Sequence, residues 1–488
     1  MIFTIVWTMN ILFLFSKIDI MKRFLIVISL FVVSSGFSQK NCSCEKALDN
    51  LITKIESDYP GFEEKTKDSL VYSSLKRQLA RESKNIDNSR CIDVLKKYTS
   101  YFKDGHIWIL PNEQRKPIEN KQTEELDVDI SNFKKRVGKT SDSLEGIWEN
   151  ENYTIGIKKT DQDEYTGFII SSNSTNWKPK QIKFKLIGEK EVNYYASDHS
   201  LHKVNYKLFE DYILHINLFK ANFVKQDAGY NLDSAKIKKA IDKLDGFYFE
   251  KLTKKTSLIR LSSFNYPYID RIEKLIVDNE NLFQNSENLI IDIRNNGGGT
   301  DAAYQTLLPF LSSGPIRSIG TKLLSTEGLI EGVSKYRNEL VEKDADANEE
   351  KIKELDLKIQ LYRKNLGKYI ENVDGAITID TIEVVKNSPK QIVILADKMV
   401  GSAAENFLLK TKQSKKVKVL GTPTSGVLDY ANAYFFKFGC ENYKLLLPTY
   451  KSLRLPDYPI DNIGVQPDIY LDNSIEDWLQ FTVDYLEN

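Results

Sequence analysis

This chain of 488 residues has no formal net charge at neutral pH and contains few cysteines and histidines. Lysine plus arginine equal aspartate plus glutamate at 68 each, which excludes a general electrostatic attraction to nucleic acid or to acidic membranes. The sequence also lacks internal repeats, long low-complexity tracts and any evident metal or nucleotide motif. We therefore expect a globular protein that needs no cofactor, and the length predicts about three domains.

The four cysteines are Cys42, Cys44, Cys91 and Cys440. The first two precede an expected helix, and Cys91 lies in the next amphipathic segment. A disulfide from Cys44, or alternatively from Cys42, to Cys91 would connect these two helices. Cys440 is expected to be free and buried, and too few ligands surround the Cys-x-Cys pair for a metal site.

A buried strand is predicted for Leu289 to Ile293, because this apolar run contains several β-branched residues. Three glycines follow at positions 297 to 299. Glycine leaves backbone amides uncovered, so that a developing negative charge can approach them. The alternative is a simple strand-to-helix turn of an α/β sheet. A dinucleotide site is disfavoured because the G-x-G-x-x-G spacing is missing.

A second strand, Gln391 to Ala396, leads to a short turn and to a helix that begins at Ser402. Ser402 and Glu405 fit a capping box, which is a structural reason for a serine at this position. Such a helix start also places the Ser402 hydroxyl in a positive local field and directs the Ala403 amide toward an oxyanion. The two roles are compatible.

A nucleophilic serine needs a base, and the chain has only four histidines. His106 follows an Asp-Gly turn at the start of an expected strand. His199 and His202 have a possible metal-ligand spacing, but no cysteine or carboxylate cluster completes a site, so we expect solvated loop residues. His215 is most simply a strand residue. The segment Pro459 to Asp468 adds two carboxylates, one of which could orient an imidazole, although a surface turn would explain it equally well.

In order and content, these segments resemble the serine peptidase family of the tail-specific (C-terminal processing) proteases and the tricorn protease core. Residues 292–299 resemble the D-L-R-x-N-x-G-G strand and oxyanion loop of that family. Residues 401–403 resemble its G-S-A nucleophile turn, and residues 464–468 resemble its G-V-x-P-D segment. The similarity covers residues 45–110 and 255–475.

One departure separates the chain from the tail-specific branch, whose members have a lysine base in a G-x-x-T-F-G-K-G segment. Here Val427 stands at the lysine position, and valine cannot take a proton. The chain is therefore more similar to the tricorn branch, where a histidine in an early D-x-H segment is the base. The resemblance implies His106 as base and Asp461 as the acidic member, where the family usually has glutamate, with Asp457 as a possible substitute.

The resemblance implies an activity as well as a fold. It implies a serine-type peptidase in which Ser402 is the nucleophile and the amides of Gly298 and Ala403 form the oxyanion hole. The implied fold is an α/β core of the ClpP/crotonase type, and the implied partner is a peptide or protein substrate. Non-catalytic retinoid-binding relatives belong to the same wider family, so the alternative is a member that binds a peptide or a hydrophobic ligand without cleaving it.

The N-terminus predicts export. After Met21, which we expect to be the true start, come two basic residues, an apolar run and small residues that suit cleavage after Ser38. An uncleaved anchor is the alternative, although the apolar run is short for a bilayer span. We expect an extracytoplasmic protein in the periplasm, at the cell surface or secreted, with no stable membrane span after cleavage.

Patterning along the chain predicts a multidomain α+β organisation. An inserted antiparallel β-domain lacks the carboxylate-binding loop of a PDZ domain, so it could recruit substrate, bind another ligand or brace the core. A helical hairpin could cap the site, mediate self-association or pack on itself as a solvated arm. The expected segments are a signal region (1–38), a helical domain ending in the His106 segment (40–110), a linker (111–139), the β-domain (140–250), the α/β core (255–475) with the hairpin (326–370), and a C-terminal tail (476–488).

Overall fold

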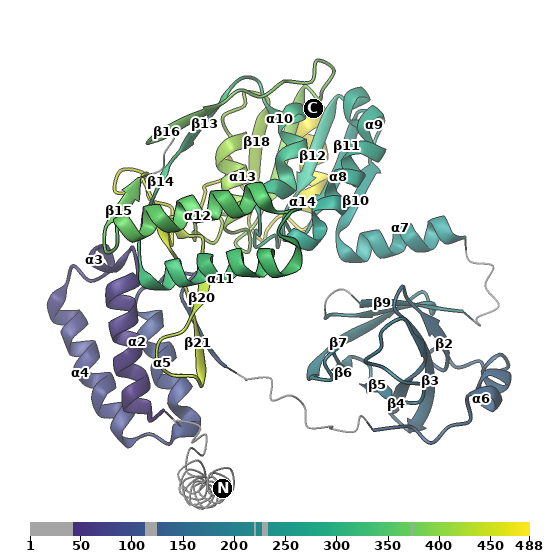
Figure 1. Cartoon of the computed structure of the whole chain (residues 1–488). Helices are drawn as coiled ribbons and strands as arrows, with labels where there is room; N and C mark the ends of the chain where they lie inside the picture. The colour runs from purple at the N-terminus through teal and green to yellow at the C-terminus, as the bar shows by residue number, and fades with distance from the viewer. Residues whose placement is uncertain (1–41, 113–123, 219–220, 227–232, 372–374) are drawn as a thin grey trace, which may run out of the picture.

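The structure is a computed structural model, and it describes residues 42–112, 124–218, 221–226, 233–371 and 375–488. The signal segment expected over residues 1–38, together with its start at Met21, lies outside these residues. The fold is a mixed α/β arrangement of several units, so the prediction of a multidomain α/β protein is confirmed (Figure 1). No helix within the described ranges is long and apolar enough to cross a membrane.

The first unit is a group of helices, of which the three long ones each bury an apolar face. Ser43 caps the first long helix and Asp68 caps the second, each by accepting a backbone N–H. A disulfide joins Cys44 to Cys91 with 5.4 Å between their Cα atoms. The helices are α2 (Cys44–Asp58), α3 (Phe62–Lys65), α4 (Ser69–Asn85) and α5 (Cys91–Ser100), with a 3-10 turn at Asn88–Arg90.

The second unit is a closed antiparallel barrel of consecutive strands. Its interior is filled by apolar and aromatic side chains, among them Trp148, Phe184 and Phe223, all of which are fully buried. The strands are β2 (Gly146–Glu149), β3 (Tyr153–Asp161), β4 (Glu164–Ser172), β5 (Ile182–Ile187), β6 (Glu191–Tyr195), β7 (Leu201–Phe209), β8 (Ile213–Ile216) and β9 (Ala221–Lys225).

The edges of the barrel unit differ from the sequence-based boundaries. The segment expected as a linker contains helix α6 (Ile130–Val137), whose Phe133 and Val137 pack against Phe168 of the barrel. The pattern was hidden because this short helix has only three apolar residues, Ile130, Phe133 and Val137, among polar ones. At the other end, β10 (Phe247–Lys251) pairs with the core sheet and not with the barrel.

The third unit is a six-stranded sheet with the order β10-β11-β12-β17-β18-β23, which is parallel except for β10. Side chains alternate across it, so that Ile291 and Ile394 face one helical layer while Ile290 and Val393 face the other. The remaining strands are β11 (Thr256–Leu261), β12 (Asn288–Asp292), β17 (Gln391–Ala396), β18 (Val417–Gly421) and β23 (Ile469–Tyr470).

Helices cover both faces of this sheet. One layer contains α8 (Ile269–Asp278), α9 (Glu280–Asn285), the 3-10 turn η3 (Asp301–Leu307), α10 (Leu308–Leu311) and α13 (Ala403–Thr411). The other contains α14 (Trp478–Glu487), so the segment expected as a tail is mostly a helix. Asp477 caps α14, and Val483 and Leu486 pack on the sheet, which explains why this segment forms a helix. A further helix, α7 (Ser234–Asp245), precedes β10, and its Asp245 accepts a hydrogen bond from Asn222 of the barrel at 2.9 Å.

Smaller sheets connect the helical unit to the core. Strand β1 (Trp108–Pro111) pairs with β21 (Tyr443–Leu447), which also pairs with β20 (Tyr434–Phe436). This pairing brings the chain directly after His106 onto the C-terminal part of the molecule. The other short strands are β13 (Ile316–Ile319), β14 (Thr321–Leu324), β15 (Tyr369–Glu371), β16 (Ile377–Asp380), β19 (Tyr430–Ala431) and β22 (Tyr450–Ser452).

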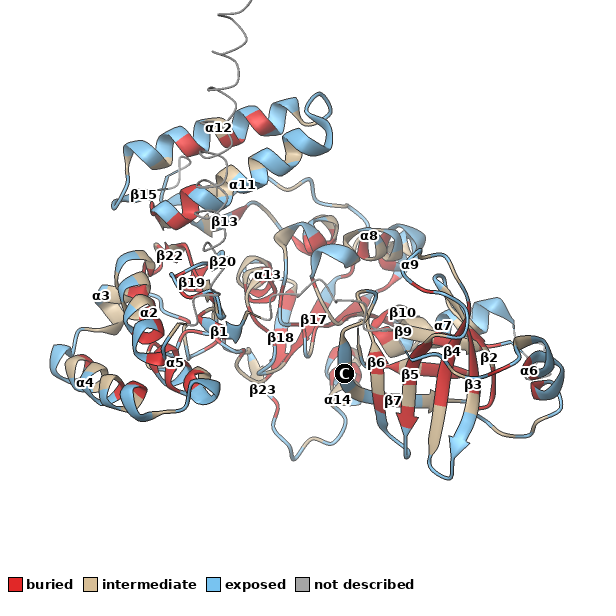
Figure 2. Cartoon of the chain, turned by 60° about the horizontal axis from the view of Figure 1, so that its bottom comes forward, coloured by how far each residue is buried: buried red, intermediate tan, exposed pale blue. Residues whose placement is uncertain are grey.

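Two long helices, α11 (Glu327–Asp344) and α12 (Glu349–Lys364), form a hairpin within the core unit. Ile352, Leu355 and Ile359 are buried on α12, and Arg337 of α11 pairs with Asp356 at 3.0 Å. Both helices are otherwise exposed over most of their surface (Figure 2).

Candidate active site

The turn before α13 holds Ser402 in a strained conformation. Its backbone φ is +54°, a region that non-glycine residues adopt rarely and usually where the surroundings enforce it. The Ser402 amide donates to Oε2 of Glu405 at 3.1 Å, and the preceding Gly401 amide donates to the carbonyl of Asn296 at 3.1 Å. These two bonds fix the turn from both sides.

The glycine loop after β12 lies directly against this turn. Gly298 has φ +93°, and a Cβ added there would lie 2.9 Å from Ser402 Cβ and 2.8 Å from the Ala403 nitrogen. The backbones of Gly298 and Ala403 therefore meet beside Ser402. Glycine is required at 298 by both the conformation and the space.

Asn296 connects the glycine loop to its surroundings, a role that sequence reasoning missed. Its side chain is fully buried, donates to the carbonyl of Leu261 at 3.1 Å, and accepts the N–H of Gly298 at 3.0 Å. Of the two expected oxyanion donors, the Gly298 amide is therefore engaged internally. The Ala403 amide has no acceptor among the described residues.

Glu405 is a buried carboxylate that joins two turns. Besides the Ser402 amide it accepts the Thr424 hydroxyl at 2.5 Å and the amides of Gly426 at 2.6 Å and Val427 at 3.0 Å. Burial raises the pKa of Glu405, although these four donors act in the opposite direction. The sequence suggested a helix-capping role only, because the turn at 424–427 is close in space but distant in sequence.

Val427 lies between the Ser402 turn and the His106 turn. A Cβ added at Gly105 would lie 2.4 Å from one methyl group of Val427, and a Cβ added at Gly401 would lie 3.2 Å from the other. The residue at the family's lysine position thus provides an apolar contact that both turns share. His106 comes directly after Gly105, so this contact places its backbone near the Ser402 turn.

The backbone of His106 is held by a buried carboxylate. Asp104 accepts the His106 N–H at 2.8 Å and the Tyr59 hydroxyl at 2.8 Å, and burial raises the pKa of Asp104. The ring nitrogen Nδ1 of His106 is itself buried, and no hydrogen-bond partner exists for it among the described residues. The imidazole therefore makes no hydrogen bond through Nδ1 to the described residues.

Asp461 lies close to the same turn but has other partners. Its Oδ1 accepts the Asp429 amide at 3.0 Å, and its Oδ2 is 3.3 Å from the Lys65 ammonium. Burial, followed by the charge of Asp104, raises the pKa of Asp461 to about 7. The neighbouring Asn462 donates to the carbonyl of Lys103 at 2.8 Å, which connects this loop to the His106 turn.

The remaining candidates lie elsewhere. Asp457, the possible substitute for Asp461, is exposed. His199, His202 and His215 belong to the barrel unit and bond the Asn176 carbonyl, the Ser200 hydroxyl and the Asn222 side chain, respectively. His202 lies in strand β7 and not in a loop as expected, because the alternation of this strand was not recognised. Within the described ranges, no cluster of metal-ligating side chains occurs.

Comparison with known proteins gives a family for the core unit. The model of "Peptidase family S41" matches residues 255–471. No curated protein matches the chain. Among solved structures, mature CPAF is 14% identical over 91% of this chain and 95% of that one, with a TM-score of 0.47. The photosystem II D1 C-terminal processing protease is 11% identical over 89% of this chain and 94% of that one, with a TM-score of 0.35. The tricorn protease is 10% identical over 91% of this chain and 37% of that one, with a TM-score of 0.39.

The contact between the two turns predicts the outcome of a substitution at Gly298. In Gly298→Ala the new methyl group meets the Gly401 carbonyl oxygen at 2.5 Å, so the loop must move away from Ser402. We expect labelling by a fluorophosphonate probe to slow by on the order of 10²-fold or more. Gly297→Ala is the matched control, because an added Cβ there has no neighbour within 4 Å. Equal labelling rates in the two variants would contradict this geometry.

Glu405 gives a second prediction. In Glu405→Gln, at least one of the four donors faces an N–H group and loses its acceptor, which costs about 1–3 kcal/mol for each buried donor left unpaired. We expect a lower melting temperature, measured by differential scanning fluorimetry, and slower probe labelling, measured by gel fluorescence. Glu350→Gln, on the exposed surface of α12, should leave both unchanged. A Glu405→Gln variant with normal labelling would show that the turn does not depend on this carboxylate.

Proposed function

Since residues 255–471 make this chain a member of peptidase family S41 and hence a serine-type peptidase, we propose that it is an exported endopeptidase. We propose that Ser402 is the nucleophile, His106 the general base and Asp461 the acidic member of the site. The substrates would be extracytoplasmic peptides or proteins. The core sheet, with parallel strands between two helical layers, suits the ClpP/crotonase-like architecture that the resemblance implies.

The observation that carries the proposal is the close approach of Gly298 to Ser402 and Ala403. A Cβ at Gly298 would lie within 3 Å of atoms in both residues, so an acyl oxygen attached to Ser402 would lie near both backbones. The Ala403 amide, at the first position of α13, is available and lies at the positive end of the helix dipole. The Gly298 amide would have to share its hydrogen between the oxyanion and Asn296.

The assignment of His106 as base is supported by what surrounds it. Val427 removes the lysine alternative, and the same residue contacts both Gly105 and Gly401. His106 would accept the Ser402 hydroxyl proton during attack on the peptide carbonyl and then give it to the leaving amine. The free Nδ1 of His106 suits a ring whose orientation is completed when substrate binds.

Asp461 would stabilise the positive charge that His106 acquires when it takes a proton. Its carboxylate shares a buried region with Asp104, which bonds the His106 backbone. In its charged form it would stabilise the imidazolium that forms during catalysis. The ion pair with Lys65 at 3.3 Å holds Asp461 in place, and a direct bond to His106 would require Asp461 to exchange that partner.

Export and recruitment are part of the same proposal. The Cys44–Cys91 disulfide suits an oxidising compartment, either the periplasm, the cell surface or the exterior. We assign substrate recruitment or bracing to the barrel, which contacts the core through Asn222 and Asp245. The exposed side of the α11–α12 hairpin, where Leu357 is 68% accessible, is our candidate for self-association.

Active-site labelling tests the function directly. Purified wild-type protein should react with a fluorophosphonate probe, while Ser402→Ala and His106→Ala should each lose nearly all reaction, because one removes the nucleophile and the other its base. Ser171→Ala and His202→Ala, both in the barrel, are the matched controls and should label normally. Folded wild-type protein that does not label would favour the alternative of a non-catalytic family member that binds a peptide or a hydrophobic ligand.

The pKa of Asp461 predicts two pH dependences. Because this pKa is raised from 3.8 to about 7, the folded protein retains a proton that the unfolded chain releases. The resulting stability is fully present below about pH 4 and is lost as the pH rises through about 7. The catalytic rate should instead rise as the pH rises through about 7, since only the charged carboxylate stabilises the imidazolium.

Asp461→Asn separates these effects. We expect a melting temperature that depends less on pH than that of the wild type between about pH 4 and 7, and a lower kcat/KM above pH 7 with any cleavable peptide. Asp457→Asn, at an exposed position, is the matched control. Loss of activity in Asp457→Asn with normal activity in Asp461→Asn would transfer the acidic role to Asp457.

A further inference from the structure

Two cysteines from opposite ends of the chain meet in one apolar cluster. Cys440 is buried in the core of the helical unit, with 3% of its surface accessible, and Cys42 packs against the same cluster. Cys42 lies just before α2, and Cys440 lies in the turn before β21. Neither is bonded to Cys44 or Cys91, which already form a disulfide with each other.

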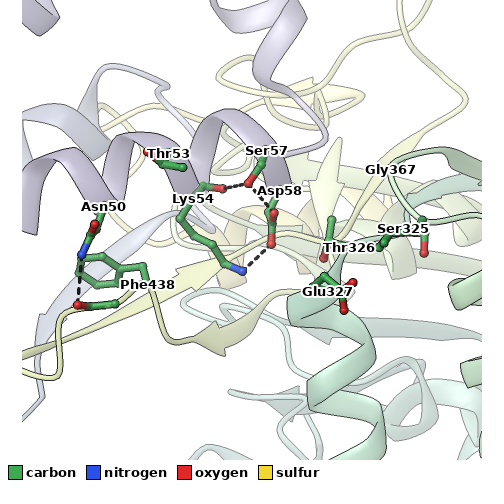
Figure 3. Close-up of a pocket in the computed structure, with 12 residues that line it drawn as sticks. Asn50, Thr53, Lys54, Ser57, Asp58, Ser325, Thr326, Glu327, Gly367 and Phe438 are labelled. Atoms are coloured by element: carbon green, nitrogen blue, oxygen red, sulfur yellow. Dashed lines mark hydrogen bonds and ion pairs between the residues drawn. The ribbon is translucent and has the colours of Figure 1, made fainter.

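The turn that carries Cys440 is fixed to α2 by a specific contact. Asn50 of α2 donates from Nδ2 to the carbonyl of Gly439 at 3.1 Å. Figure 3 shows this bond at the end of a groove in which Phe438 lies beside α2. The backbone of Cys440 is therefore held against the helix whose start carries Cys42.

The two thiols are neighbours in the folded protein. Both pack in the same apolar cluster, a hydrogen bond from Cys42 helps to raise the pKa of Cys440, and both thiols contribute to the raised pKa of Tyr443. A pair of thiols in contact, in a chain that already contains a disulfide close by, has the arrangement that precedes disulfide formation. We propose that Cys42 and Cys440 form a second disulfide, which links the start of α2 to the turn before β21.

The chemistry is a thiol–disulfide exchange with an external disulfide, such as the oxidised form of a thiol oxidoreductase. Cys42 is the more exposed thiol, and burial raises the pKa of Cys440 to about 12, so the Cys42 thiolate attacks first. This step forms a mixed disulfide and releases one thiol of the oxidant. Cys440 then attacks the Cys42 sulfur and releases the second thiol, so that two electrons and two protons leave with the reduced oxidant.

The bond would connect the two parts of the protein that hold the His106 segment. The helix α2 ends next to Tyr59, which bonds Asp104. Strand β21 pairs with β1, which follows His106. A covalent link between the start of α2 and the turn before β21 would therefore restrain both supports of this segment. The inference does not depend on catalysis, because it concerns sulfur chemistry alone.

Thiol mapping of the full-length protein, purified from an oxidising compartment, tests the proposal. The denatured protein is alkylated without reductant, digested and analysed by mass spectrometry. We expect no alkylation of Cys42 or Cys440 in the wild type, and alkylation of Cys440 alone in Cys42→Ser, with the Cys44–Cys91 bond retained. Wild-type protein that contains the Cys44–Cys91 bond but is alkylated at both Cys42 and Cys440 would overturn the proposal.

Cys42 and Cys44 occur together in one tryptic peptide, so a linked peptide from the wild type does not show which of the two is bonded. The variant Cys44→Ser removes this ambiguity. We expect a Cys42–Cys440 link in this variant, with Cys91 alkylated. A Cys42–Cys91 link with Cys440 alkylated would contradict the pairing. The melting temperature should fall by the same amount in Cys42→Ser, in Cys440→Ser and in the double variant, since each removes the same bond. Probe labelling of Ser402, measured on the same samples, reports separately on the peptidase function.

Discussion

The site depends on the buried carboxylate of Glu405. A carboxylate without access to water must be surrounded by donors, and Glu405 has four: the Ser402 amide, the Thr424 hydroxyl and the amides of Gly426 and Val427. Satisfying it fixes the conformation of the serine turn and joins that turn to residues 424–427. Val427 is then positioned to contact both Gly105 and Gly401. One carboxylate thus links the Ser402 turn to the residue that contacts the turn before His106.

The second requirement is that the N-terminal helical unit must dock on the core. The candidate base, His106, belongs to the first hundred or so residues, while the candidate nucleophile, Ser402, follows strand β17 of the core sheet. Pairing of β1 with β21 and the Lys65 ion pair with Asp461 both cross this junction. Because no single unit contains the whole site, any peptidase activity requires the assembled chain.

Much of the core was predictable from the sequence, because apolar runs and glycine motifs are local signals. The strands at 288–292 and 391–396 and the helix after Ser402 lie where the pattern predicted them. The role of Glu405, the link through Asn296 and the partners of Asp461 depend on contacts between distant segments, which periodicity does not encode. Helices α6 and α14 were missed because short amphipathic segments near polar sequence resemble linkers and tails. The expected roles of Ser402, His106, Asp461, Gly298 and Ala403 stay predictions.

A crystal structure of the protein with a covalently bound peptidyl inhibitor would test most directly whether Ser402 is the nucleophile. We expect a covalent bond to Ser402 Oγ and an inhibitor oxygen within hydrogen-bond distance of the Ala403 amide and close to Gly298. We also expect the His106 ring to contact Oγ or the leaving-group position. A bond to another residue, or a different side chain in the place of the His106 ring, would contradict these expectations.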